Sequence, residues 1–298
     1  MAIAPTFEYA RPRNLEEALR LKAQYRERAL VLAGGTDLIA NLREDMIHPE
    51  LLIDIKDIPG LDKIVIEAGT LKLGPLVTFT QLIEFGPLGK TFPMLLDASR
   101  TVASVGIRNR ATLVGNICSA VPSLDSAPPL LCHEAVVHCL SLEGERHIRI
   151  DDWFTGPRKT ALKPDEIVTG ITLQPVFHSG SGIYLKLGRY GGEDLAQTGW
   201  GILIDGANHY RVAHCALGPV PARASKIEAL LDGNQLNEAL IQQAMDLVPE
   251  EISPITDIRS SKEYRTHISK VILKRGLLAA RERLAGKDID PRTLLGGI

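Results

Sequence analysis

A pair of glycines at positions 34 and 35 carries the clearest chemical signal, in the run Val31-Leu32-Ala33-Gly34-Gly35-Thr36-Asp37. Glycine readily adopts positive φ, so successive N–H groups of such a turn can converge on an anion. The Thr36 hydroxyl and a following helix N-terminus would add donors and the positive end of a dipole. Because the loop contains no lysine, the pattern favours a diphosphate diester over a triphosphate. The alternative is a strand-to-helix turn in which glycine only provides clearance.

A second polar segment carries residue types that complement such a site. Thr112, Gly115 and Asn116 lie within residues 107–117, and Asp125 follows in a stretch rich in Ser and Pro. A carboxylate suits the hydroxyl groups of a ribose or ribityl chain, whereas amides and backbone N–H groups suit phosphates and ring edges. Taken alone, this segment is an ordinary loop. Together, the two segments predict a long dinucleotide bound between two subdomains.

Other catalytic and metal-binding patterns are not found in the sequence. The eight histidines form no HxH or HExxH pair, and His133 and His138 are five residues apart, a spacing unsuited to one face of a helix. The four cysteines form no CxxC pair, so we expect no zinc or iron–sulfur site within this chain. We therefore predict no metal ligands and no catalytic acid, base or nucleophile in this chain.

Composition limits the class of protein. At 298 residues, of which 45% are hydrophobic and 23% charged, the chain is expected to form about two globular domains. A net charge of −2 gives no electrostatic reason to expect nucleic-acid binding. The sequence offers neither a secretory signal nor the ~20 consecutive apolar residues of a membrane span. With cysteines interpreted as reduced thiols, a cytoplasmic location is predicted.

Local patterns predict the elements that must position the two segments. Helices are expected to begin at the capping residues Asn14 and Thr78, while residues 115–129 are expected to be irregular. Further helices are predicted at 94–104, 225–231, 236–247 and 261–284, and strands at 29–33, 51–55, 64–66, 71–73, 135–140, 147–150, 183–187, 201–204 and 212–217. The pattern is α/β up to about residue 175 and α+β beyond it.

Taken in order, these motifs resemble the FAD-binding signatures of the flavoprotein (medium) subunits of molybdenum hydroxylases, the xanthine dehydrogenase and carbon monoxide dehydrogenase type. One departure is Val114, which stands where that family usually has glycine. The similar motifs cover almost the whole chain and lie at residues 33–37, 107–109, 111–117, 125, 164–168, 186–189, 193–196, 216–218 and 260–265.

The resemblance implies an α+β protein with two domains. Residues 1–175 would form a split, two-subdomain FAD-binding fold of the PCMH type, with subdomains at about 1–57 and 58–175. Residues 176–298 would form a C-terminal α+β domain with an antiparallel sheet and helices. The FAD site would comprise Val31, Leu32, Ala33, Gly34, Gly35, Thr36, Asp37, Thr112, Gly115, Asn116, Asp125, Val168 and Lys186.

Within that site, the resemblance places Val168 and Lys186 near the flavin, with Glu193 and Asp194 as an acidic pair near the isoalloxazine ring. A lysine ammonium there would stabilise the reduced ring and raise its potential, and the acidic pair would lower it.

The implied function is that of an FAD-carrying electron-transfer subunit of a multi-subunit molybdenum hydroxylase. Electrons would pass from [2Fe–2S] clusters on a small partner subunit through FAD to NAD or another acceptor. The molybdenum cofactor and the choice of substrate would lie on a large partner subunit. The alternatives are a stand-alone FAD-dependent oxidoreductase on the same fold and a non-catalytic nucleotide-binding scaffold.

Overall fold

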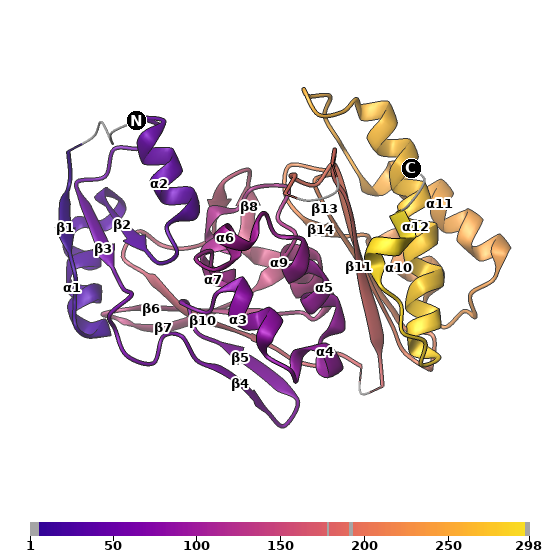
Figure 1. Cartoon of the computed structure of the whole chain (residues 1–298), viewed down its shortest axis with the longest axis horizontal. Helices are drawn as coiled ribbons and strands as arrows, with labels where there is room; N and C mark the ends of the chain where they lie inside the picture. Colours follow the sequence, from indigo (N-terminus) through magenta and orange to yellow (C-terminus); the bar gives the residue numbers. More distant parts are fainter. Residues whose placement is uncertain (1–5, 178, 191–192, 296–298) are drawn as a thin grey trace.

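Three sheets follow one another along the chain in a computed structural model, which describes residues 6–177, 179–190 and 193–295. In Figure 1 the three-stranded sheet lies at one end, the five-stranded sheet in the middle, and the four-stranded sheet between this middle part and the C-terminal helices. A separate pair of short strands is formed by β8 (Phe154–Gly156) and β9 (Lys159–Thr160). His178, one of the eight histidines, lies outside the described residues.

The N-terminal sheet is parallel, with strand order β1-β3-β2. Helix α1 begins where the sequence predicts, because the Asn14 side chain accepts a hydrogen bond from the Glu17 N–H at 2.9 Å. The apolar face of α1 packs on β2 and β3. The elements are β1 (Glu8–Ala10), α1 (Leu15–Tyr25), η1 (Arg26–Arg28), β2 (Ala29–Leu32), α2 (Thr36–Arg43) and β3 (Leu51–Asp54).

The middle sheet is antiparallel, with strand order β4-β5-β10-β6-β7. Its strands are β4 (Ile64–Glu67), β5 (Thr70–Leu73), β6 (Val136–Ser141), β7 (Gly144–Arg149) and β10 (Ile167–Leu173). The helices of this part are α3 (Phe79–Glu84), α4 (Leu88–Thr91), α5 (Pro93–Thr101), α6 (Val105–Arg108), α7 (Leu113–Ser119), α8 (Ala127–Cys132) and α9 (Ile150–Trp153). As predicted, Thr78 and Gln81 form a capping box at the start of α3.

The expectation that residues 115–129 are irregular is wrong at both ends of the stretch and holds only for residues 120–126. Helix α7 occupies the first part of this stretch and α8 the last part. Thr112 caps α7, and prolines occupy the first turn of α8, where their missing N–H groups cost no helical hydrogen bond. A glycine and two prolines that suggest a loop therefore lie at helix starts.

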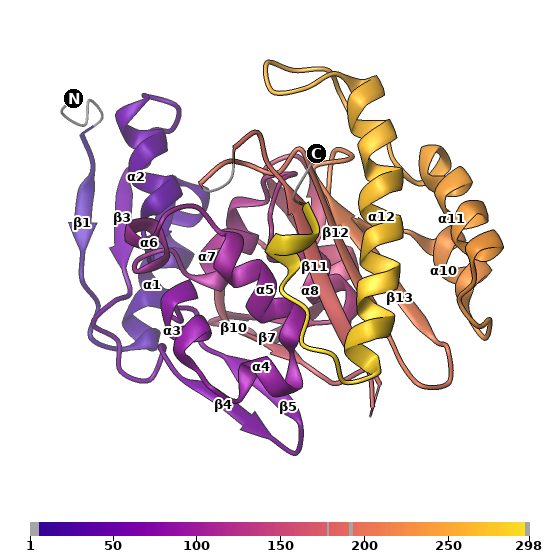
Figure 2. The ribbon, with the colours of Figure 1, turned by 45° about the vertical axis from the view of Figure 1, so that its right-hand side comes forward.

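The C-terminal sheet is antiparallel and is covered on both faces. Figure 2 shows α12 running along β11 and β12 on one face, while α5 and α8 contact the sheet from the middle part of the chain. Every residue of β12 is consequently buried. The elements are β11 (Ser181–Leu187), β12 (Thr198–Ile204), β13 (Tyr210–Cys215), β14 (Ala222–Arg223), α10 (Ser225–Leu231), α11 (Glu238–Glu251), α12 (Lys262–Leu284) and η2 (Pro291–Leu295).

One hydrophobic core, here called the middle core, joins the middle and C-terminal parts. It runs from Leu71 to Ala216 and includes Tyr184 and Leu203 of the C-terminal sheet. A buried ion pair adds to this connection, because Arg283 at the end of α12 lies 2.6 Å from Asp97 of α5. Among the described residues, no helix has the length and apolar character needed to cross a bilayer.

Candidate functional site

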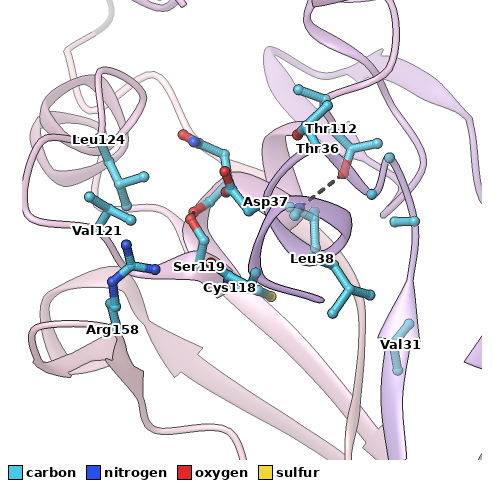
Figure 3. Close-up of a pocket in the computed structure, with 18 of the residues that line it drawn as sticks. Val31, Thr36, Asp37, Leu38, Thr112, Cys118, Ser119, Val121, Leu124 and Arg158 are labelled. Carbon is cyan, nitrogen blue, oxygen red and sulfur yellow. Dashed lines mark hydrogen bonds between the residues drawn. The ribbon is translucent and has the colours of Figure 1, made fainter. Parts of the chain in front are cut away.

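A cavity of about 790 Å³ lies where the three parts of the molecule meet. Its walls come from the β2–α2 connection, from residues 102–125, from the start of β10, and from residues 186 and 193–195. Figure 3 shows Thr36, Asp37 and Thr112 on one side of this cavity, and Val121, Leu124 and Arg158 on the other. The volume falls within the ~300–1,000 Å³ that is usual for ligand and cofactor sites.

Twelve of the thirteen residues predicted for the site line this cavity. The exception is Leu32, which is buried and packs beneath Gly35. Glu193 and Asp194 also line the cavity. The structure thus brings together the two segments, which the sequence analysis could connect only by their chemistry.

The N-terminus of α2 opens into the cavity without a side-chain cap. Gly35 is its N-cap residue and has φ of +77°, a conformation that other residues rarely adopt. Gly34 is required for a different reason, because a Cβ there would collide with the carbonyl oxygen of Arg110. The N–H groups of residues 36–38 have no hydrogen-bond acceptor among the described residues. Free N–H groups at a helix start are suited to an anion.

The N-terminus of α7 faces the same cavity, but the N–H groups of Leu113, Gly115 and Asn116 have acceptors within the chain. The Thr112 hydroxyl oxygen accepts a hydrogen bond from the Gly115 N–H at 2.9 Å. The Leu113 N–H donates to the carbonyl oxygen of Val77 at 3.1 Å. A Cβ at position 115 would lie 2.8 Å from the Thr112 hydroxyl oxygen, so the cap itself requires glycine there.

Asp125, which also lines the cavity, forms the centre of a buried polar network. Its two carboxylate oxygens accept hydrogen bonds from the Tyr184 hydroxyl at 2.7 Å and the Lys186 ammonium at 2.8 Å. Lys186 also donates to the carbonyl oxygen of Thr101 at 2.8 Å. Burial raises the pKa of Asp125, while the ammonium and the hydroxyl act in the opposite direction.

This network changes the expected role of Lys186. Both side chains of the Lys186–Asp125 pair are less than a tenth exposed, so the positive charge is compensated directly. A lysine whose charge is neutralised at 2.8 Å contributes much less to a flavin potential than the free ammonium that the sequence analysis assumes.

The two residues of the acidic pair, Glu193 and Asp194, also differ in what their carboxylates contact. The Asp194 carboxylate accepts hydrogen bonds from the N–H groups of Arg189 at 2.7 Å and Tyr190 at 3.0 Å, and so holds the turn that follows β11. Glu193 is exposed at the wall of the cavity. Of the two, only Asp194 has hydrogen-bond partners among the described residues, so the Glu193 carboxylate is the better placed to act on the electrostatics of a bound molecule.

Three further charged residues of the wall were not predicted. Lys22 is buried and donates to the carbonyl oxygens of Arg26 at 2.9 Å and Ala29 at 2.7 Å, and burial lowers its pKa. Its position on the apolar face of α1 is the signal that could have identified it. Glu166 binds Arg146 in a bidentate ion pair at 2.6 and 2.8 Å. Arg158, an exposed residue of the cavity wall, follows no sequence motif.

Comparison with known families decides what kind of site this is. The family described as FAD binding domain in molybdopterin dehydrogenase matches residues 5–175. The chain belongs to this family. A second family, the CO dehydrogenase flavoprotein C-terminal domain, matches residues 185–280. The resemblance stated from the sequence, to the FAD-binding subunits of molybdenum hydroxylases, is thereby confirmed, as is the α+β fold class.

Members of the flavoprotein subunit family match this chain along nearly its whole length. The xanthine dehydrogenase FAD-binding subunit of Escherichia coli O157:H7 is 32% identical over 286 residues, which are 94% of this chain and 97% of that protein. The carbon monoxide dehydrogenase medium chain of Hydrogenophaga pseudoflava is 31% identical over 288 residues, 95% of this chain and 100% of the relative. A solved structure of carbon monoxide dehydrogenase from that organism superposes with a TM-score of 0.90 at 30% identity, covering 95% and 99% of the two chains.

The cavity fits the cofactor that this family binds. FAD combines two ring systems with a pyrophosphate, and the lining combines apolar side chains such as Val31, Val114 and Val168 with the free N–H groups of α2. The lining also includes hydroxyl and carboxylate groups, those of Thr36, Asp125 and Glu193. The chain is thus the FAD-binding subunit type of a molybdenum-dependent dehydrogenase.

Proposed function

We propose that residues 31–37 hold the pyrophosphate of FAD at the N-terminus of α2. The observation that supports this most directly is that the N–H groups of residues 36–38 lie at the cavity without an acceptor among the described residues. In this assignment Thr112, Gly115 and Asn116 form the second, rigid wall of the site. Asp125, Val168 and Lys186 lie towards the flavin, and Arg158 of the cavity wall adds positive charge for the phosphates.

In this site the protein binds FAD, orients it and shields it from water. FAD supplies the redox chemistry when it is bound. The Asp125–Lys186–Tyr184 network fixes the position of a carboxylate that can accept further hydrogen bonds from cofactor hydroxyls. The apolar side chains of Val31, Val114 and Val168 exclude water from the ring systems.

We also propose that this subunit passes electrons from the iron–sulfur clusters of a small partner subunit to NAD or another acceptor. A large partner subunit would hold the molybdenum cofactor. Relatives carry the names medium chain and FAD-binding subunit, which describe parts of larger assemblies. Exposed apolar side chains supply surface that a partner can cover: Ile107 and Leu195 line the cavity, and Val105 and Tyr190 are exposed close to them in sequence or in the adjoining turn.

The proposed organisation is an FAD-binding domain at residues 1–175, with subdomains at about 1–57 and 58–175, and a C-terminal domain at 176–298. The three sheets of the fold support this division. A cytoplasmic location is supported by the four cysteines, all of them free thiols.

The decisive experiment compares the isolated FAD-loaded chain with the chain supplemented by its two partner subunits. The isolated chain should bleach with a chemical reductant but keep its flavin absorbance with hypoxanthine, nicotinate, carbon monoxide or aldehydes. Adding the iron–sulfur and molybdenum subunits should produce bleaching by the substrate of the complex. Bleaching of the isolated, metal-free chain by one of these substrates would show a stand-alone flavoenzyme instead.

A further inference from the structure

Three side chains that are not part of the FAD cavity meet on the β6–β7 hairpin. His138 and His147 are directly opposite each other in the antiparallel register, and Glu145 lies two residues before His147. Side chains two residues apart on a strand share a face, so all three extend from the same side of the hairpin. Their neighbours Val137 and Ile148 point the other way, into the middle core.

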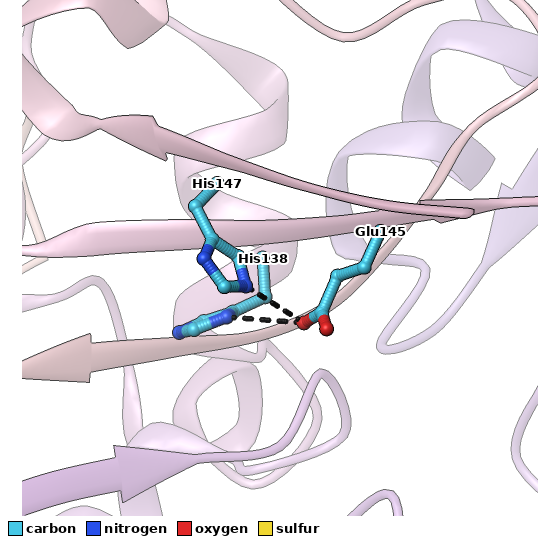
Figure 4. A group of neighbouring side chains, drawn as sticks. All are labelled: His138, Glu145 and His147. Carbon is cyan, nitrogen blue, oxygen red and sulfur yellow. Dashed lines mark ion pairs between the residues drawn. The ribbon is translucent and has the colours of Figure 1, made fainter.

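The ligand atoms of these side chains are already close together (Figure 4). Oε1 of Glu145 lies 2.9 Å from Nε2 of His147 and 3.4 Å from Nδ1 of His138. All three ligand atoms lie within 4.8 Å of one another. Bonds of about 2.0–2.1 Å to a tetrahedral metal ion put neighbouring ligand atoms about 3.3 Å apart, so binding requires only small side-chain adjustments.

The environment of His138 orients its ring for this purpose. The Thr172 hydroxyl oxygen on β10 lies 3.0 Å from Nε2 of His138, which leaves Nδ1 directed to Glu145. A hydrogen bond to the second ring nitrogen is the usual way in which proteins fix a histidine ligand.

Two other histidines in the chain provide an internal contrast. His48 lies 2.9 Å from Asp45, and His209 lies 2.9 Å from Asp205. Each is a single histidine with a single carboxylate, the common form of a surface ion pair. Among the described residues, only the hairpin cluster combines three groups with metal-ligand geometry.

We propose that His138, Glu145 and His147 bind one divalent transition-metal ion, with Zn²⁺ as the first choice. Two imidazoles and one carboxylate form a three-ligand set that leaves the fourth tetrahedral position of zinc to water. The ion would join β7, the edge strand of the middle sheet, to the neighbouring strand β6. No metal site is predicted from the sequence, because spacing along the chain does not show the register that brings residues 138 and 147 together.

The test is a titration of the FAD-loaded, tag-free protein with Zn²⁺ by isothermal titration calorimetry at pH 7.5. We expect one ion per chain, and at least about tenfold weaker binding in His147→Ala and Glu145→Gln, because each removes a ligand. Thr172→Val should weaken binding about tenfold by releasing the His138 ring. The matched controls His48→Ala and His209→Ala should bind like the wild type. His147 is exposed, so its substitution should leave the fold intact.

Two further readouts identify the ligands and the role of the ion. Electron paramagnetic resonance of the Cu²⁺-loaded protein should show coupling to two ring nitrogens in the wild type and to one in His147→Ala. Zn²⁺ should raise the melting temperature of the wild type but not that of His147→Ala. Binding that does not saturate at one ion per chain, or equal affinity in the wild type and His147→Ala, would overturn the proposal in favour of scattered surface binding.

Discussion

At the N-terminus of α7 the N–H groups of Leu113 and Gly115 have acceptors within the chain, whereas the first N–H groups of α2 have none among the described residues and open into the cavity. Thr112 caps α7 through its hydroxyl oxygen, but Gly35 has no side chain with which to cap α2. Both helix starts contain a glycine in the family signature, but glycine is required at the two positions for different physical reasons. Gly115 makes room for the Thr112 cap, and Gly35 provides a positive φ.

This difference separates structural from ligand-binding helix starts. An N–H group that is satisfied within the chain contributes to stability whether or not a ligand is present. An N–H group without an acceptor contributes its hydrogen bond only when a ligand arrives, and a net hydrogen bond to a charged group is worth about 1.5–3 kcal/mol. The comparison therefore predicts that substitutions at α2 change FAD affinity, whereas substitutions at the α7 cap change stability.

The largest effect is expected at Gly35. Gly35→Val should abolish FAD binding at micromolar concentration, a loss of at least about a hundredfold if two hydrogen bonds to the pyrophosphate are lost. Absorbance of the purified protein measures the flavin content directly. Gly206→Ala is the control, because a Cβ there meets no neighbour within 4 Å.

Gly35→Asn tests the same position with less backbone strain, because asparagine tolerates φ of +77° better than valine does. It should retain the far-ultraviolet circular dichroism of the wild type and more FAD than the valine variant. Wild-type flavin content in a folded Gly35→Val protein would show that the pyrophosphate lies elsewhere.

The next largest effect is expected at Asp125. Asp125→Ala should weaken FAD binding five- to a hundredfold through a lost hydrogen bond of about 1–3 kcal/mol. It should also lower the free energy of unfolding by about 3 kcal/mol, because it leaves the buried Lys186 ammonium without its partner. FAD titration of the apoprotein and urea unfolding measure the two quantities.

The double variant Asp125→Ala/Lys186→Met separates these two effects. Removing the orphaned charge should restore most of the stability but not the FAD affinity. Recovery of both together would mean that Asp125 acts on FAD only by holding Lys186.

Hydrogen exchange can compare the two helix starts without any substitution. In the apoprotein the amides of residues 36–38 should exchange rapidly, and FAD should slow them at least about tenfold. The amides of Leu113 and Gly115, which already have acceptors, should change much less. Equal protection of both helix starts by FAD would remove the distinction between them.

The smallest changes in FAD affinity and in the free energy of unfolding are expected for substitutions of Thr112 and Thr36. Thr112→Val should lower the free energy of unfolding by about 1 kcal/mol, the usual contribution of an N-cap hydroxyl. Thr36→Val should change stability by less than ~0.5 kcal/mol while weakening FAD binding about fivefold. Urea unfolding of the apoprotein and FAD titration of both variants check this pair. Equal destabilisation by the two substitutions would contradict the comparison.

Local features of the fold could be predicted from the sequence because they depend on residues that are close along the chain. The helix starts at Asn14 and Thr78, and the strands expected at 64–66 and 71–73, are found where short motifs place them. The start of α7 was missed because Gly115 was interpreted as a loop residue. Its reason for being glycine, the contact with the Thr112 hydroxyl, depends on the cap geometry and not on residue type alone.

The sequence predicts most of the residues that line the cavity, but it does not predict which distant residues pair with one another. Asp125 and Lys186 are 61 residues apart, and nothing in their local sequence indicates that one neutralises the other. The same holds for the strand order of the middle sheet, in which β10 lies between β5 and β6. Family resemblance supplied the list of residues, and tertiary packing determines what each of them does.

The middle core, which is shared between the middle and C-terminal parts, links cofactor binding to the cooperativity of unfolding. Because Tyr184 and Leu203 are buried in the same core as Leu71, melting either part exposes apolar surface of the other. The cavity likewise takes walls from both parts, so neither retains the site alone. The holoprotein should therefore unfold in a single calorimetric transition. Free FAD at a hundred times its Kd should raise the free energy of unfolding by about 2.7 kcal/mol and move the whole transition to higher temperature. Bound FAD would therefore stabilise the middle and C-terminal parts together.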